Sequence, residues 1–322
     1  MRLKQRKYFG AIRLIAVALL AWICGMPATQ SAHADTGPKP SVIVTVENLD
    51  GKVCYGTLLS DDISLGPTSA YSPEHPYIPS KFDPTSENYS AEEHAIWKAF
   101  VEYADPDGYY YQQVHWACHE TGKISWTYYP PSPFKILLYF PETQTFVSSG
   151  IYESYAFHSY FSATLSDTDF TVSQTASLDV RKNYDYTWEI VSLIVRIVVT
   201  ILIELFVAWL FNLHTKTQIL SVTIVNVVTQ TALNVALNIL SFFQSTWALI
   251  WYIPLELAVF VIEAVAYTVI LNLLQPKTVG ANGDIKNPDH LSIGKCVLFS
   301  LVANILSFAA GFALVKVIPG VF

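Results

Sequence analysis

Four long apolar runs in the second half of the chain limit its fold more than any other feature. They cover roughly residues 188–211, 217–243, 248–274 and 294–318. Each run reaches the length of about 20 residues that a helix needs to cross a bilayer. Inside hydrocarbon the backbone polar groups of a segment must bond to one another, so such runs form helices. With a hydrophobic content of 52%, the sequence predicts an all-α membrane domain over residues 187–322.

The first 34 residues have the organisation of a signal peptide. The basic start MRLKQRKYFGAIR precedes the apolar stretch IAVALLAWICG and a small-x-small site at Ala32-His33-Ala34. We therefore expect cleavage of residues 1–34 and export of residues 35–186. The exported segment holds 8 Lys and Arg against 20 Asp and Glu. This acidic balance argues against nucleic acid as a partner.

The exported segment has the pattern of a β-rich α+β domain with one helix. SVIVTVENLDGKVCYGTLL places two strand-like runs around Leu49-Asp50-Gly51, which predicts a hairpin. Residues 90–104 predict the helix, with Ser90 as the N-cap and Glu93 closing a capping box. GYYYQQVHWAC, KISWTYY, FKILLYF and TFVSSGIY follow as predicted strands. About 150 residues are enough for one independent core.

Lysines and aromatic residues predict the orientation in the membrane. Lys216, Lys277, Lys286 and Lys295 lie in or beside two of the connections between spans. Trp188, Trp247, Trp251 and Tyr252 gather at the opposite ends. Basic residues favour the cytoplasmic side and aromatic belts mark the interfaces. We therefore expect a multi-pass plasma-membrane protein with residues 35–186 and the C-terminus outside the cytoplasm.

Every apolar run also carries polar residues at helical spacing. The second has Asn226, Gln230, Asn234 and Asn238, the third has Glu256 and Glu263, and the fourth has Ser300, Asn304 and Ser307. The first run contains Arg196 and Glu204. Polar groups in hydrocarbon need partners. The stripes should therefore face one another inside a four-helix bundle.

A rise of about 1.5 Å per residue separates these polar residues into two layers. Arg196, Asn234 and Glu256 fall in the outer layer, where we expect an ion pair of Arg196 with Glu256 braced by Asn234. The inner layer holds Glu204, Glu263, Asn226 and Asn304. Two carboxylates in a medium of low dielectric constant cannot both ionise cheaply, so at least one should hold a proton or bind a cation. The alternative is a static hydrogen-bonded network that orients the helices.

Cys54 and Cys118 are the two cysteines of the exported segment, and we expect a disulfide between them. The alternative is a metal site, because His115 and His119 flank Cys118. In a strand the two histidines would share a face opposite to Cys118, which suits zinc poorly. Residues 105–108 start like a calcium loop, but its twelfth position holds Trp116 where a Glu is needed, so a plain turn is favoured. We expect no metal and no cofactor.

The exported segment is rich in aromatic residues. Tyr109, Tyr110 and Tyr111 cannot all face one side of a strand. Some should be exposed, where tyrosines commonly bind glycans or peptides, unless the domain is packed on both faces. The chain contains no G-x-S-x-G, H-E-x-x-H or P-loop sequence. We therefore expect a protein that is not an enzyme, with a cell-wall glycan or peptide as its ligand.

Several stretches resemble a known group of sequences. They are SVIVTVENLDGKVCYGTLL, AIWKAFVEYADPDGYYY, SWTYYPPSPFKILLYFP and, in the apolar runs, RIVVTILIE and NVVTQTALN. Together they are similar to a family of uncharacterised signal-bearing membrane proteins from Gram-positive bacteria. The resemblance implies a location in the cell envelope and no particular activity.

Two functions are compatible with these observations. In the first, the exported domain binds a ligand or partner, and the polar-cored bundle anchors it or couples it to another membrane protein or a second copy. In the second, the chain is a small transporter or channel subunit with a proton or cation site at Glu204 and Glu263. An intramembrane enzyme is disfavoured, because the spans offer no Ser/His, Cys/His or two-metal set of residues.

Overall fold

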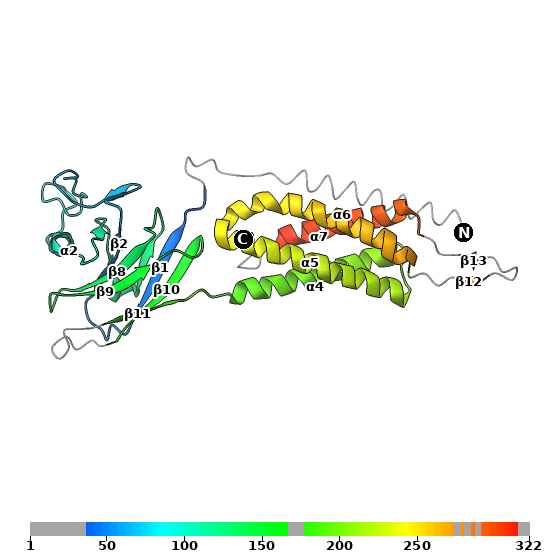
Figure 1. Cartoon of the computed structure of the whole chain (residues 1–322), viewed down its shortest axis with the longest axis horizontal. Coiled ribbons are helices and arrows are strands. Elements are labelled where there is room, and N and C mark those ends of the chain that lie inside the picture. Colours follow the sequence, from blue (N-terminus) through cyan, green and yellow to red (C-terminus); the bar gives the residue numbers. More distant parts are fainter. Residues whose placement is uncertain (1–36, 167–176, 274–277, 280–284, 287–290, 315–322) are drawn as a thin grey trace. The chain divides into compact units, whose positions relative to one another are not determined.

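The computed structural model describes residues 37–166, 177–273, 278–279, 285–286 and 291–314. Gly37–Asp185 form one compact unit, the β-domain, and the other unit contains four long helices (Figure 1). A β-rich domain followed by an all-α region of four helices confirms the predicted fold class. The signal peptide predicted over residues 1–34 lies outside the described residues.

Two sheets form the β-domain. The first has the order β11-β10-β1-β7, from β1 (Ser41–Glu47), β7 (Lys123–Trp126), β10 (His158–Leu165) and β11 (Leu178–Lys182). The second has the order β5-β2-β8-β9, from β2 (Tyr55–Ser60), β5 (Tyr110–Tyr111), β8 (Phe134–Phe140) and β9 (Thr145–Tyr152), with β6 (Trp116–Ala117) paired to β2. β3 (Ser64–Leu65) pairs with β4 (Thr68–Ser69). Two helices, α2 (Ala91–Glu102) and α3 (Cys118–Thr121), complete the domain.

β8 lies in the middle of the β-domain and is buried on both faces. Ile136 and Leu138 on one face join the core of the first sheet, which includes Val44. Leu137 on the other face packs in a second core with Phe100 of α2. Alternate residues of a strand point to opposite sides. This double burial explains why FKILLYF is a continuous apolar run.

The hairpin predicted around Leu49-Asp50-Gly51 is wrong. A turn is present, with positive φ at Asp50 and Gly51, but β1 and β2 belong to different sheets. β1 pairs in parallel with β10, with Val44 opposite Phe161, and β2 pairs with β8. Stacked sheets lie about 10 Å apart. The connection from β1 to β2 therefore carries the chain across the core, which a hairpin turn does not do.

The strand predicted for GYYYQQVHWAC is interrupted. Only Tyr110–Tyr111 and Trp116–Ala117 pair with β2. Between them Gln113 has a φ of 60°, in the left-handed region. The Gln113 side chain donates to the carbonyls of Ser69 and Tyr77, at 2.9 and 3.1 Å. Cys118 then begins α3. The predicted face-sharing of His115 and His119 along one strand therefore does not occur.

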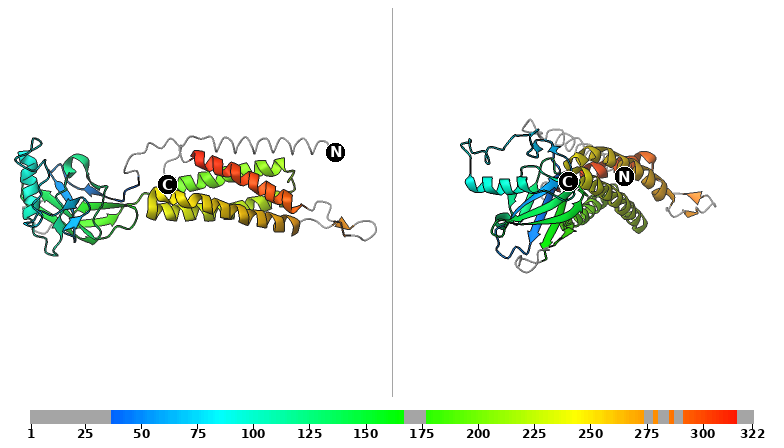
Figure 2. Two further views of the ribbon diagram at one scale, coloured as in Figure 1. Left: turned by 90° about the horizontal axis from the view of Figure 1, so that it is seen from above. Right: turned by 60° about the vertical axis from the view of Figure 1, so that its left-hand side comes forward.

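The four long helices form a bundle. They are α4 (Thr187–Leu210), α5 (Lys216–Gln244), α6 (Leu249–Leu273), reached through the 3-10 turn η1 (Ser245–Ala248), and α7 (Ile293–Leu314). α4 packs on α5 and α7, and α6 packs on the same two helices (Figures 1 and 2). All four are long and apolar enough to cross a membrane. The chain is therefore an integral, multi-pass membrane protein. Two short strands, β12 (Thr278–Val279) and β13 (Ile285–Lys286), pair between α6 and α7.

Candidate functional site

The polar stripes of the four helices face the interior of the bundle. Glu204, Asn226 and Glu263 are 0% exposed, whereas Leu202 and Val228 on the outer faces are each 62% exposed. A bilayer solvates apolar side chains and leaves polar ones without partners. The burial confirms the prediction that the stripes meet one another.

Glu204, Asn226 and Tyr267, from α4, α5 and α6, form the Glu204 cluster. Asn226 Nδ2 and the Tyr267 hydroxyl, the latter at 3.0 Å, both donate to Glu204 Oε2. Asn226 Nδ2 also donates to the carbonyl of Val222 at 3.1 Å. That bond fixes which way the Asn226 amide points, because the reverse would set two oxygens against each other. The second oxygen of the carboxyl group, Glu204 Oε1, has no hydrogen-bond partner.

Glu263, Thr229 and Asn304, from α6, α5 and α7, form the Glu263 cluster. Thr229 Oγ1 donates to Glu263 Oε1 at 2.6 Å, and Asn304 Nδ2 donates to Oε2 at 2.6 Å. Each oxygen of this carboxyl group therefore has a donor of its own. The two clusters adjoin along α5, where Thr229 Oγ1 also lies 3.3 Å from the Asn226 carbonyl. Each of the two predicted glutamates therefore accepts a hydrogen bond from a different asparagine, Glu204 from Asn226 and Glu263 from Asn304.

The two clusters contain more acceptors than donors. Glu204 Oε1, Asn226 Oδ1 and Asn304 Oδ1 are buried acceptors without a partner. The Tyr267 hydroxyl and the two asparagine amides already donate to other oxygens. A buried polar atom without its hydrogen bond costs about 1–3 kcal/mol. The arrangement therefore favours an added proton, water molecule or cation.

Arg196, Asn234, Tyr252 and Glu256 form the Arg196 cluster, nearer the end of the bundle at which α4 begins. Arg196 Nη1 donates to Asn234 Oδ1 at 3.1 Å, as the predicted bracing requires. The Tyr252 hydroxyl hydrogen bonds with both Arg196 and Glu256. Tyr252 therefore contacts both charged groups, and the direct ion pair of Arg196 with Glu256 stays a prediction. Tyr252 lies one helical turn before Glu256 on α6, which lets its hydroxyl reach between them.

A small cavity of about 10 Å³ adjoins the Arg196 cluster. Gln230 Nε2, Glu256 Oε2 and Ser307 Oγ are buried atoms without partners, and all three residues line the cavity. Its size and its polar wall suit a single water molecule. Gln230 follows Thr229 on α5 and Ser307 lies one turn beyond Asn304 on α7, so these two lining residues lie within one helical turn of the Glu263 cluster.

Apolar side chains close the opposite end of the bundle. The buried residues there are Val207, Phe211, Leu213, Leu271, Leu291 and Phe299. The side chain of Asn272 clamps the backbone of Leu291, accepting from its N–H at 3.0 Å and donating to its carbonyl at 3.2 Å. The polar interior therefore runs from the cavity to Glu204 and stops at an apolar plug.

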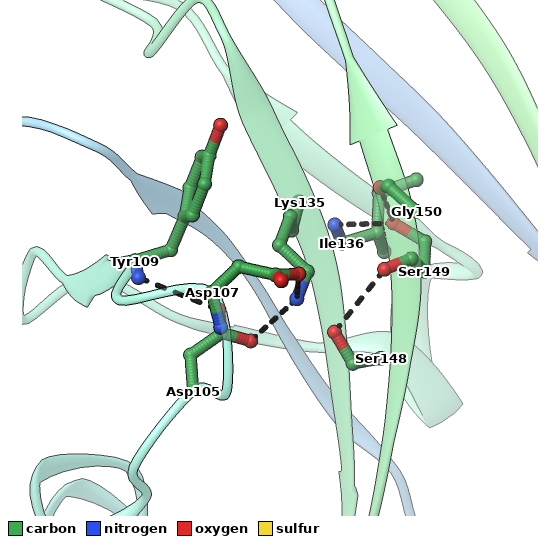
Figure 3. Close-up of polar contacts among 8 residues, drawn as sticks. All are labelled: Asp105, Asp107, Tyr109, Lys135, Ile136, Ser148, Ser149 and Gly150. Carbon is green, nitrogen blue, oxygen red and sulfur yellow. Dashed lines mark hydrogen bonds and ion pairs between the residues drawn. The ribbon is translucent and has the colours of Figure 1, made fainter.

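Lys135 supplies a buried ion pair in the β-domain. Its Nζ lies 2.7 Å from Asp105 Oδ1 and 2.8 Å from Asp107 Oδ2 (Figure 3). Burial alone would lower the pKa of Lys135, but the hydrogen bonds and charges of the two carboxylates outweigh it and raise the pKa. The turn after α2 starts like a calcium loop in sequence, but its two carboxylates bind the ammonium group of Lys135. It fastens the end of α2 to β8.

His115 belongs to a second polar group of the β-domain. Its Nδ1 lies 2.7 Å from the Tyr111 hydroxyl and its Nε2 lies 2.9 Å from Glu93 Oε2. Burial and the charge of Lys81 lower the pKa of His115 to about 4. A neutral ring has one N–H, so Nε2 donates to Glu93 and Nδ1 accepts from Tyr111. This corrects the predicted capping box: Ser90 caps α2, but the Glu93 carboxylate goes to His115.

The predicted disulfide is absent from the structure. Cys54 and Cys118 are buried free thiols, although the two residues are neighbours: Cys118 N donates to the Cys54 carbonyl at 2.8 Å. The pairing of Tyr55 with Ala117 continues to these residues and sets them opposite each other. Among the residues that the structure describes, no group of three His, Cys, Asp or Glu side chains could hold a metal ion.

Three hydroxyl-bearing residues of the bundle escaped the sequence interpretation: Thr229, Tyr252 and Tyr267. Their spacing gave a signal. Tyr267 follows Glu263 by four residues and Tyr252 precedes Glu256 by four, which places each tyrosine on the polar face of α6. A tyrosine in an apolar run is easily assigned to the lipid interface, and for that reason the pattern was missed.

Comparisons with models of protein families, with curated proteins and with solved structures found no match for this chain.

Proposed function

We propose that this is a non-enzymatic integral protein of the bacterial plasma membrane. Its β-domain would lie outside the cytoplasm and bind a ligand or partner. The bundle would anchor the β-domain and couple it to another membrane protein or to a second copy. The resemblance of the sequence to signal-bearing membrane proteins of Gram-positive bacteria supports a place in the envelope.

An exposed aromatic pair on the β-domain carries this proposal. The rings of Tyr128 and Tyr129 meet edge to face at 4.7 Å, with 39% and 51% of these residues exposed. Lys39 Nζ lies 4.8 Å above the Tyr128 ring. Gly66 allows the Tyr129 ring to pack closely, because a Cβ there would come within 2.7 Å of it. Rigid aromatic rings beside a cation suit a glycan or peptide of the cell wall.

Binding to isolated cell-wall material tests the aromatic pair. Purified protein in mild detergent would be mixed with cell walls of a Gram-positive bacterium, and the retained fraction measured. We expect Tyr128→Ala together with Tyr129→Ala to weaken retention about tenfold. Tyr77→Ala is the matched control, since Tyr77 is 69% exposed. Equal retention of all variants would remove this ligand class.

The assembly state tests the coupling role. The tagged protein would be purified from its native membrane in mild detergent and its mass determined. A stoichiometric complex with one membrane protein, or a defined homo-oligomer, supports coupling. A monomer that keeps its cell-wall binding would indicate that the bundle serves only to anchor the β-domain.

A second function, a small transporter or channel subunit, is favoured by the missing donors around Glu204 and Glu263. Three buried acceptors there have no partner, and the neighbouring cavity has a polar wall. An added proton or cation would complete both clusters. The chain would then move protons or cations through its polar interior.

Flux into proteoliposomes tests this second function. We expect Glu204→Gln to abolish proton or cation flux while the melting temperature is kept. Asn238→Ala is the control, since Asn238 belongs to the same polar stripe of α5 but to neither cluster. Flux that persists in Glu204→Gln, or wild-type protein without flux, would leave the clusters as scaffolding.

A further inference from the structure

We propose that Glu204 is a proton-binding site, and that Glu263 is the ionised member of the two carboxyl groups. This inference deepens the second proposed function by naming the species and the residue. It rests on the hydrogen-bond pattern around the two groups. Their burial is the same, since both residues are 0% exposed.

The pattern around Glu204 is that of a neutral carboxylic acid. Such a group has one carbonyl oxygen that accepts hydrogen bonds and one hydroxyl that donates. Oε2 of Glu204 accepts from both Asn226 and Tyr267, as a carbonyl oxygen does. Oε1 has no donor, which suits a hydroxyl oxygen. An ionised group would leave Oε1 as a bare, buried, charged acceptor, which is far more costly.

An acceptor for the proposed hydroxyl lies within the same cluster. Asn226 Oδ1 is buried and lacks a partner, and its amide faces Glu204 through the bond from Nδ2. The bond to the Val222 carbonyl prevents the amide from turning round. A proton on Oε1 would therefore supply the hydrogen-bond donor that Asn226 Oδ1 lacks.

The pattern around Glu263 is that of a carboxylate. Each oxygen has a donor at 2.6 Å, Thr229 Oγ1 for one and Asn304 Nδ2 for the other. The Thr229 hydroxyl has a single proton and also lies 3.0 Å from the Val225 carbonyl, and we assign the proton to the shorter contact, with Glu263. Asn304 Nδ2 is held toward Glu263 by its second bond, to the Ser300 carbonyl at 3.0 Å. Two short bonds, one to each oxygen, stabilise a negative charge. A negative charge on Glu263 also makes ionisation of Glu204 less favourable, because the two like charges repel each other.

The access to this proton is one-sided. Gln230 and Ser307 line the cavity beside Glu256, and they lie within one helical turn of Thr229 and Asn304 of the Glu263 cluster. That cluster adjoins the Glu204 cluster along α5. Beyond Glu204 the plug containing Phe211, Leu291 and Phe299 is apolar. Glu204 would therefore exchange its proton through the Glu263 cluster and the cavity.

Infrared spectroscopy of the whole chain in detergent at neutral pH tests the assignment. A neutral carboxylic acid has a C=O band separate from the carboxylate bands, and that band shifts in D₂O. We expect the band in the wild type, its loss in Glu204→Gln and its retention in Glu263→Gln. Wild-type protein without the band, or a band that survives Glu204→Gln, would overturn the proposal; the first result would point to a bound cation.

Thermal stability of the same two variants supplies a second measurement. Gln matches a neutral carboxyl group, with one oxygen that accepts and one nitrogen that donates, so Glu204→Gln should keep its melting temperature. Glu263→Gln turns an NH₂ group toward Thr229 or Asn304 and should melt several degrees lower. The reverse order would also overturn the proposal. Flux decides separately on transport: a proton on Glu204 without flux would refute the second function and leave this assignment intact.

Discussion

Lys135 shows how one side chain can fix a whole segment of the β-domain. Its side chain is 3% exposed and that of Asp105 is 0% exposed. We expect Lys135→Met to lower the free energy of unfolding by about 3 kcal/mol, because removing one partner of a buried pair leaves the other charge uncompensated. Denaturant unfolding of Gly37–Asp185 measures this change.

Two further variants separate charge from packing at this site. Adding Asp105→Asn to Lys135→Met should recover part of the loss, because the uncompensated charge is then gone. The matched control is Lys98→Met, which breaks the pair with Glu102 at 3.7 Å on the surface of α2. Exposed pairs contribute about 0–1 kcal/mol. Equal effects of Lys98→Met and Lys135→Met would contradict the buried role.

His115 makes the β-domain sensitive to acid. Its pKa is about 4 in the folded domain and about 6.5 in an unfolded chain. The unfolded state therefore binds more protons between these values, and stability falls as the pH drops from 6.5 to 4. One pKa unit corresponds to about 1.4 kcal/mol, so the loss amounts to about 3 kcal/mol. Unfolding free energies measured across this range should show a flatter profile for His115→Gln; identical profiles would exclude His115 as the cause.

Cys54 and Cys118 give the third prediction at this scale. Their sulfurs are neighbours in a domain that we expect to be exported, so the disulfide stays a prediction. Both thiols are 0% exposed, and labelling of the folded protein would be slow with or without a bond. We expect protein unfolded without reductant to take up no label at either cysteine, and to be labelled at both after reduction. Labelling without reductant would rule out the bond.

The helices were easier to predict from sequence than the strands. α4, α5 and α6 begin and end within two residues of the expected spans, because apolar length and polar spacing are properties of one segment. One partner of β1 is β10, more than a hundred residues later, and nothing in SVIVTVE specifies this pairing. The sequence paired Arg196 with Asn234 correctly. It did not place Tyr252 beside Arg196 and Glu256, because contacts between helices depend on how the helices pack.

Gly311 tests the packing of α7 against α6. A Cβ at this position would lie 2.7 Å from the Tyr252 hydroxyl and 3.9 Å from Arg196 Nη2. We expect Gly311→Ala to destabilise the bundle by about 1–3 kcal/mol, because Tyr252 is held by hydrogen bonds and cannot move freely. Gly294→Ala, where nothing lies within 4 Å, should be neutral or slightly stabilising. Melting temperatures in detergent compare the two, and an equal or smaller effect at Gly311 would contradict the close packing.

The orientation of the helices in the membrane can be tested by chemical labelling. If the β-domain is outside, the turn between α4 and α5 faces the cytoplasm and the turn between α5 and α6 faces outward. We expect Gln244→Cys to react with a membrane-impermeant maleimide on intact cells, and His214→Cys only after permeabilisation. Both positions are exposed, and the native Cys54, Cys118 and Cys296 are buried. The opposite pattern would reverse the proposed topology.

The clamp of Asn272 on Leu291 bears on how this sequence can change. The two residues close the connection between α6 and α7 at its base, independently of what lies between them. The closure entropy of a connection grows slowly with its length, by about 0.6 kcal/mol for each doubling. Insertions between residues 274 and 290 should therefore leave the bundle intact, which makes this connection a place where length can vary while the membrane core stays the same.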